Sequence, residues 1–261
     1  MATTIARSKA ASSLKQALCL MLLLPAVVCA QQLTVAAGNS MPPYVIPASQ
    51  NGIALERLRA ALSSENIELD LVFGSNADNL NAFQTGLADA MLVAPMDSSG
   101  LFITRTPIAQ MQNVAISLKP LPLQQISDLK SYRIGAFSLA HRMLPQPFAE
   151  TAADSPDYRE YPRQLEQVKS LFSGDNDVLV MERSIFRYYF SQLRQLDPGN
   201  PAYQQKPRYY PLFPTSLRHT GLSDPSMRDK LDQGLKRLQQ SGEYDRIRER
   251  YERLMDEYLL R

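Results

Sequence analysis

Cysteine is almost missing from this chain, and histidine is as scarce. Its two cysteines, Cys19 and Cys29, both fall in the first thirty residues, and only two histidines occur. The remainder of the chain can therefore form no disulfide, so stability has to come from a sizeable apolar core. Hydrophobic residues make up 44% of the sequence, which is ordinary for a globular protein.

Motifs that carry catalysis or bind phosphate are missing too. His141 and His219 lie far apart, and no HExxH or paired CxxC spacing occurs. None of the GxGxxG, GxxxxGK[ST] and GxSxG patterns is found. The sequence therefore predicts no catalytic residue, no metal site and no cofactor, and it favours a binding protein over an enzyme.

The first thirty residues have the order of a secretory signal peptide. A start with three bases and no acid precedes the apolar run "ALCLMLLLPAVV" (17–28), and Val28-Cys29-Ala30 follows as a cleavage site. The apolar run is short for a membrane span, and Val28 is bulky for a lipid attachment signal at Cys29. We therefore predict cleavage after Ala30 and a periplasmic protein that begins at Gln31.

Charge excludes two classes of partner. The 28 Lys and Arg residues fall to 25 without the leader, against 26 acids, so the formal charge of the mature chain is −1. Such a balance argues against a nucleic-acid or membrane-surface partner.

Hydrophobic patterns alternate between strand and helix. The segment 33–37 indicates a strand, Leu55, Leu58 and Leu62 indicate a helix, and 67–73 alternates like a strand. Leu80, Phe83 and Leu87 form a second helical stripe, and Gly86 lies where that helix would end, before the apolar strand 89–94. This βαβαβ order predicts a parallel sheet covered by helices.

The same pattern returns later in the chain. A helix, a glycine, an aspartate, an apolar strand and a polar end occur at 80–97 and again at 165–183. We interpret the repetition as two similar α/β lobes. The C-terminal segment from Ser223 is helical, with mixed charges that are typical of a solvated surface.

Six pieces follow one another along the mature chain: "LTVAAGNSMPPY", "NGIALERLRAAL", "LNAFQTGLADAML", "ISDLKSYRIGAF", "LEQVKSLFSGDNDVLVME" and "LKRLQQSGEYDRI". In the order and spacing of these pieces the chain resembles the extracytoplasmic solute-binding proteins of the amino-acid type, family 3. The resemblance implies the α/β, two-lobe, type II periplasmic binding fold, with two crossing hinge strands and ligand in the cleft.

Applied to this chain, the family pattern divides it after the signal peptide (1–30). Lobe 1 is expected at 31–115 plus 211–261 and lobe 2 at 116–210, joined by crossing strands at 113–118 and 208–213. Ligands of open α/β sheets bind beyond the carboxyl ends of strands, where the loops after residues 94 and 181 lie.

The family's usual carboxylate-binding arginine has no counterpart here. Counting from the flanking motifs places that position at Ser98 or Leu101, in a loop about three residues short. Leu139, Ala140 and His141 replace the usual Gly-Thr or Gly-Ser helix start. Either Arg105 or Arg142 could supply an anion contact, although surface positions fit both.

Glu182 matches the acid that usually binds the ligand's ammonium group in this family. The alternative is that Glu182 is a surface residue paired with Arg183. Tyr44 matches an aromatic lining position, with core packing as its alternative. The predicted ligand-binding residues are Tyr44, Pro95, Ser98, Ser99, Ser138, His141, Arg142 and Glu182.

The resemblance implies capture of a small polar solute for an ABC importer or a membrane sensor by a monomeric protein. Without the arginine clamp, we expect a cationic ligand that needs no α-carboxylate, such as an amine or an amino-acid derivative. Two alternatives stay open: a cyclohexadienyl dehydratase-like enzyme with Glu182 as its acid, and a regulatory binding protein for a receptor.

Overall fold

The computed structural model describes residues 31–95 and 99–259. The chain divides into the units 1–31 and 32–261. Of the first unit only Gln31 is described, so the predicted signal peptide lies outside the described residues and stays a prediction. None of the helices in the described ranges is long and apolar enough to cross a bilayer.

Five strands form the first sheet of unit 32–261. Their order is β2 (Ile67–Gly74), β1 (Gln31–Gly38), β3 (Ala90–Met91), β12 (Gly221–Leu222) and β4 (Phe102–Ile103). β1 and β3 are parallel, whereas β12 runs antiparallel to both of its neighbours. The antiparallel strand comes from far along the chain, so the segment between β4 and β12 leaves this sheet and returns to it.

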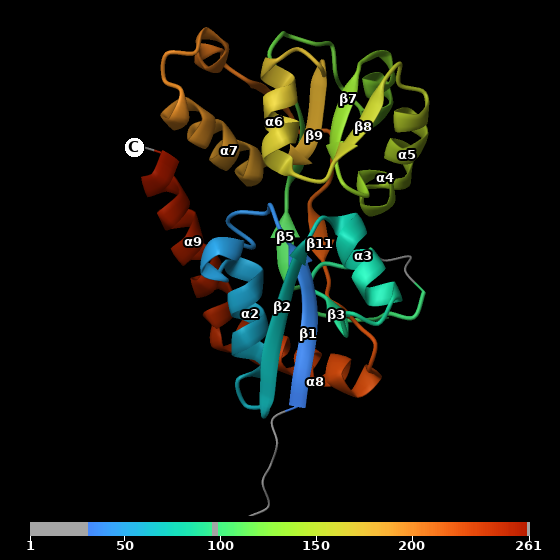
Figure 1. Cartoon of the computed structure of the whole chain (residues 1–261), viewed down its shortest axis with the longest axis vertical. Coiled ribbons are helices and arrows are strands. Elements are labelled where there is room, and N and C mark those ends of the chain that lie inside the picture. Colours follow the sequence, from blue (N-terminus) through green and yellow to red (C-terminus); the bar gives the residue numbers. More distant parts are fainter. Residues whose placement is uncertain (1–30, 96–98, 260–261) are drawn as a thin grey trace, which may run out of the picture. The chain divides into compact units, whose positions relative to one another are not determined.

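Helices cover the first sheet. They are α2 (Ile53–Leu62), α3 (Asn76–Gln84), α8 (Pro225–Ser241) and α9 (Glu243–Leu259) (Figure 1). α2 buries Leu55, Leu58 and Leu62 at helical spacing, as the sequence pattern predicts. Gly242, with φ 76°, separates the two C-terminal helices.

The second sheet is built from the segment that leaves the first. Its order is β10 (Arg208–Tyr210), β6 (Asn113–Ser117), β9 (Val178–Glu182), β7 (Ile134–Phe137) and β8 (Tyr158–Tyr161). β9 is buried along its whole length. The accompanying helices are α4 (Ala140–Met143), α5 (Gln146–Ala153), α6 (Gln164–Phe172) and α7 (Arg183–Leu196), with short 3₁₀ turns at 47–49, 126–131 and 201–204.

A short antiparallel ladder connects the two sheets. It pairs β5 (Ala109–Met111) with β11 (Ser216–Arg218), and Figure 1 shows these strands between the two sheets. The predicted crossing segments 113–118 and 208–213 instead contain β6 and β10, which are strands of the second sheet. The strands that connect the two sheets are therefore β5 and β11, which lie next to the predicted segments in the chain. The exact lobe boundaries stay a prediction.

Candidate functional site

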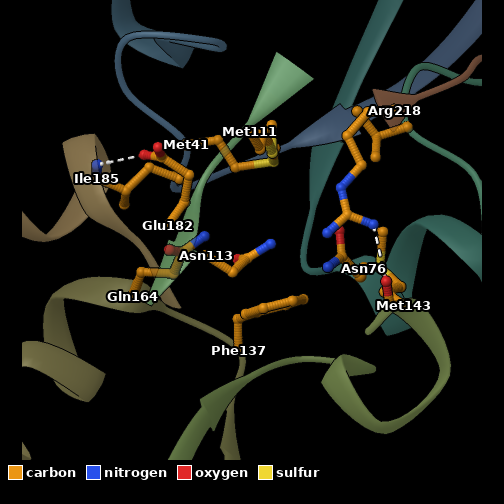
Figure 2. A pocket seen from close by; sticks show the side chains of 11 residues that line it. Met41, Asn76, Met111, Asn113, Phe137, Met143, Gln164, Glu182, Ile185 and Arg218 are labelled. Atoms are coloured by element: carbon orange, nitrogen blue, oxygen red, sulfur yellow. Dashed lines mark hydrogen bonds between the residues drawn. The ribbon is translucent and has the colours of Figure 1, made fainter. Parts of the chain in front are cut away.

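A pocket lies where β5, β6, β9 and β11 meet, and its empty space, open solvent at its mouth included, is about 330 Å³ (Figure 2). Its walls come from strands of the second sheet, from the connecting strands β5 and β11, and from α3 and loops beside the first sheet. The polar lining residues are Asn76, Asn113, Gln164, Glu182 and Arg218; the apolar ones are Met41, Val93, Met111, Phe137, Met143 and Ile185. The pocket therefore combines one acid, one base and three amides with methionine-rich walls, a composition typical of small-ligand sites.

Glu182 is placed at the pocket by the end of β9. It is the N-cap of α7, and one carboxylate oxygen accepts hydrogen bonds from the backbone N–H groups of Ser184 (2.6 Å) and Ile185 (2.9 Å). Only 4% of the residue is exposed. Desolvation raises the pKa of Glu182 to about 7, although the hydrogen bonds from the backbone act in the opposite direction.

The predicted alternative for Glu182, a surface glutamate paired with Arg183, is wrong. Glu182 is buried, and the Arg183 guanidinium lies over the ring of Tyr209, 5.6 Å from its centroid. Glu182 cannot be a solvated surface acid because β9 delivers it into the interior.

Tyr44 lies behind Glu182. Its hydroxyl donates to the carbonyl of Gln110 (3.2 Å), and its interaction with the Glu182 carboxyl contributes to the pKa shifts of both groups. Burial is the main reason why the pKa of Tyr44 is raised well above its usual value. Tyr44 is not among the pocket's lining residues, and at 8% exposure it contributes to the core.

A smaller pocket of about 230 Å³ shares Met41, Asn76, Phe137 and Gln164 with the larger one. Ser138 lines it and connects the two sheets. The Asn76 amide donates to the Ser138 carbonyl (2.8 Å), and the backbone N–H of Ala77 donates to the Ser138 hydroxyl (3.2 Å).

Most other predicted ligand-binding residues lie elsewhere. His141 contacts Glu160, with 2.7 Å between Nδ1 and Oε1, and 45% of its side chain is exposed. Arg142 in α4, the buried Pro95 and the exposed Ser99 line neither pocket. Ser98 lies outside the described residues. Of the predicted residues that the structure describes, Glu182 lines the larger of these two pockets and Ser138 the smaller.

Sequence reasoning predicted one lining residue of the larger pocket, Glu182, and among those it missed Arg218 is the charged one. Arg218 ends β11, is 7% exposed, and donates from Nη1 to the carbonyl of Met143 (2.9 Å). Neither arginine proposed from the sequence takes this place, because Arg105 is exposed on the segment before β5. The available signal was a base in "TSLRHTG", directly after the second expected crossing strand.

No cluster of His, Cys, Asp and Glu residues that could hold a metal ion occurs within 31–95 and 99–259. The donor set of the larger pocket, one carboxylate with amides and a guanidinium, suits an organic ligand better than a metal ion.

Sequence comparison gives no relative: no protein-family model matches the chain, and no curated protein does. Solved structures do match. A histidine kinase sensor domain with similarity to periplasmic binding proteins has TM-score 0.70 and 15% identity, covering 85% of this chain and 96% of that one. An amino-acid ABC transporter substrate-binding protein from Streptococcus pneumoniae, bound to L-arginine, has TM-score 0.65 and 20% identity over 86% and 95%.

A third match is an ancestral amino-acid-binding protein, a precursor of cyclohexadienyl dehydratase. Its TM-score is 0.65 and its identity 15%, covering 84% of this chain and 95% of that one. At such identities the likeness concerns the fold, and it agrees with the two sheets and the connecting ladder described above. The chain therefore has the two-lobe α/β fold of the type II periplasmic binding proteins.

Proposed function

We propose that this chain captures a small polar solute, amino-acid-like or amine, in the larger pocket. The observation that carries this proposal is Glu182, a buried carboxyl group at a pocket wall, with a pKa near neutrality. An ammonium group beside Glu182 would stabilise its ionised form and restore the interactions that burial removes.

The proposed setting is the periplasm, with the ligand passed to an ABC importer or reported to a membrane sensor. Similar folds serve both uses, since the matches include a transporter's substrate-binding protein and a kinase sensor domain. Export depends on the predicted signal peptide. The intact mass of the protein from a periplasmic extract tests it, and a mass that includes residues 1–30 or a lipid would refute it.

A thermal-shift screen of the mature protein against amino acids, polyamines and organic acids is the first test. Calorimetry on each hit then compares wild type with Glu182→Gln, which keeps an acceptor for the α7 N-terminus but cannot ionise. For an ammonium ligand, wild-type binding should strengthen as the pH rises through about 7. Glu182→Gln should bind at least about tenfold more weakly.

The matched control is Glu166→Gln, which changes an exposed acid of α6 that pairs with Lys169. It should leave affinity and pH dependence unchanged. If no compound in the screen binds, or if Glu182→Gln binds the hits as wild type does, the proposed function fails.

A second candidate function is acid-catalysed elimination. The raised pKa of Glu182 favours it, because a general acid is most effective when its pKa lies near the pH at which the enzyme works. One of the structures with a similar fold is an ancestral binding protein that is a precursor of a dehydratase. We expect no turnover, because one Glu182 oxygen already accepts two backbone hydrogen bonds as the α7 cap. Phenylpyruvate release from prephenate that depends on Glu182 would establish the enzyme instead.

A further inference from the structure

Within residues 31–95 and 99–259 two arginines, Arg57 and Arg218, are buried, and in Arg57 each of the three guanidinium nitrogens donates a hydrogen bond. Arg57 is 1% exposed and donates from Nη1 to Ile108 (2.9 Å) and from Nη2 and Nε to Tyr244 (2.8 and 3.2 Å), all to backbone carbonyls. Its guanidinium also lies 3.3 Å from the centroid of the Tyr244 ring. This arginine joins α2, α9 and the start of β5, and its role is structural.

Arg218 lacks such partners. Beyond its one hydrogen bond to the Met143 carbonyl, its Nε is buried without an acceptor. In residues 31–95 and 99–259 no acid forms an ion pair with it. Burial lowers the pKa of Arg218 to about 10, so it is still a cation at neutral pH. A buried cation with so few partners is costly to the fold unless something else pairs with it.

The position of Arg218 says what could pair with it. β11 holds the residue opposite Ala109 of β5, and its side chain points into the larger pocket (Figure 2). Glu182 lies across the pocket from it, and the two do not form an ion pair with each other. On the Glu182 side, Gln164 has a buried Oε1 that also lacks a partner. The pocket thus presents a donor at one end and acceptors at the other.

The backbone N–H groups at the start of α4, which could also donate to an anion, are already used. Glu160 accepts the backbone N–H groups of Leu139 (2.7 Å) and His141 (3.2 Å) at the start of α4. Tyr158 donates its hydroxyl to the same carboxylate (2.6 Å). A ligand carboxylate would therefore find no backbone donors at this helix start, and Arg218 remains as the cation that lines the pocket.

We propose that Arg218 binds the carboxylate of the captured ligand, while Glu182 and Gln164 bind its ammonium group. The ligand class is then a small zwitterion, whose apolar part contacts Met41, Met111 and Phe137. This inference rests on the proposed function and refines it. It replaces the expectation of a ligand without a carboxylate, which assumed that no cation reaches the pocket.

The test compares three forms of each probe on the wild-type protein: the twenty L-α-amino acids, their α-carboxamides and the corresponding decarboxylated amines. At least one free amino acid should bind with micromolar Kd. Its amide and its amine should bind at least about 100-fold more weakly, which corresponds to about 2.7 kcal/mol. This arm uses only wild type, so it holds whether or not a variant folds.

Arg218→Met should lose about the same factor for the free amino acid and little for the amide, because the lost interaction is the one that the amide already lacks. Arg105→Gln, at an exposed arginine outside the pocket, is the control and should bind as wild type. Amide or amine binding equal to that of the acid overturns this inference, as does unchanged acid binding by Arg218→Met. If amines bind to wild type and bind more weakly to Glu182→Gln, the proposed function is supported even though this inference fails. If none of the three probe classes binds, both the inference and the proposed function are refuted.

Discussion

At the scale of single residues, the same substitution should change the free energy of unfolding by very different amounts at the two buried arginines. Arg57→Met leaves the carbonyls of Ile108 and Tyr244 without their donor, and we expect a loss of about 2 to 4 kcal/mol in the free energy of unfolding. Arg218→Met loses one hydrogen bond but also removes a buried charge, so the ligand-free protein should stay within about 1 kcal/mol of wild type.

Urea denaturation of the ligand-free proteins measures both values. A destabilisation of Arg218→Met as large as that of Arg57→Met would mean that Arg218 supports the fold. That result would remove the reason for assigning its charge to a ligand.

Glu182 gives a second residue-scale prediction, on pH. Its pKa is raised from 4.5 to about 7, so between these values the folded protein holds a proton that the unfolded chain has lost. Stability should therefore fall as the pH rises through this window, by up to about 3 kcal/mol, and should level off above it. Glu182→Gln should lack this slope.

The measurement is the free energy of unfolding from pH 4 to 8 for the ligand-free wild type and Glu182→Gln. Tyr44 faces Glu182 but titrates far above this range. Asp177, held by Arg133, and Asp128 have lowered pKa values and act below the window. Parallel curves for the two proteins would contradict the assigned pKa.

At the scale of elements, α8 packs on α2 through a glycine. A Cβ added to Gly234 would lie 2.0 Å from the backbone oxygen of Ala61, and backbone cannot move aside cheaply. Gly234→Ala should lower the free energy of unfolding by about 2 to 3 kcal/mol through overpacking. Gly199→Ala is the control, since its Cβ would meet no atom within 4 Å, and it should change stability by less than about 0.5 kcal/mol. Thermal or urea unfolding of the two variants checks this, and equal stabilities would mean that the helices can separate freely.

The same elements explain how far the sequence predicts the fold. Leu55, Leu58 and Leu62 lie on the buried face of α2, and the positive φ values of Gly86 and Gly174 fit the predicted helix ends. By contrast, Leu87, which periodicity assigns to the α3 stripe, is 71% exposed, because α3 ends at Gln84. Periodicity continues past a helix end that only capping and tertiary contacts define.

The candidate site was less predictable for a related reason. Glu182 is the last residue of a buried strand, a position that the local hydrophobic pattern can indicate. Arg218 and Gln164 reach the pocket because β11 crosses between the sheets and α6 begins at it, and both facts depend on strand order. The register of distant strands is not contained in local hydrophobic pattern, so these residues could not be assigned before the sheets were known.

At the scale of the whole 32–261 unit, side-chain hydrogen bonds connect the parts that carry the two sheets. The Ser40 hydroxyl, in the loop after β1, lies 3.0 Å from the Tyr189 hydroxyl of α7 and accepts from the backbone N–H of Gln164 (3.0 Å). Ser138 makes a second connection to Asn76 and Ala77. Because such contacts exist only when the two sheets are close, they favour a closed form, in which a ligand can touch Arg218 and Glu182 together.

Tyr189→Phe therefore tests hinge closure without altering the larger pocket. Losing one hydrogen bond of about 1 kcal/mol from the closed form should weaken ligand binding about fivefold, because apparent affinity scales with the closed fraction. Tyr158→Phe is the matched control, since its hydroxyl bonds to Glu160 inside the second sheet and should affect stability but not affinity. Small-angle scattering supplies the structural measurement: saturating ligand should lower the radius of gyration of wild type, and more ligand should be needed for the same decrease in Tyr189→Phe. A radius of gyration that does not change at saturation would show that capture needs no closure, and the connections through Ser40 and Ser138 would then be permanent parts of the fold.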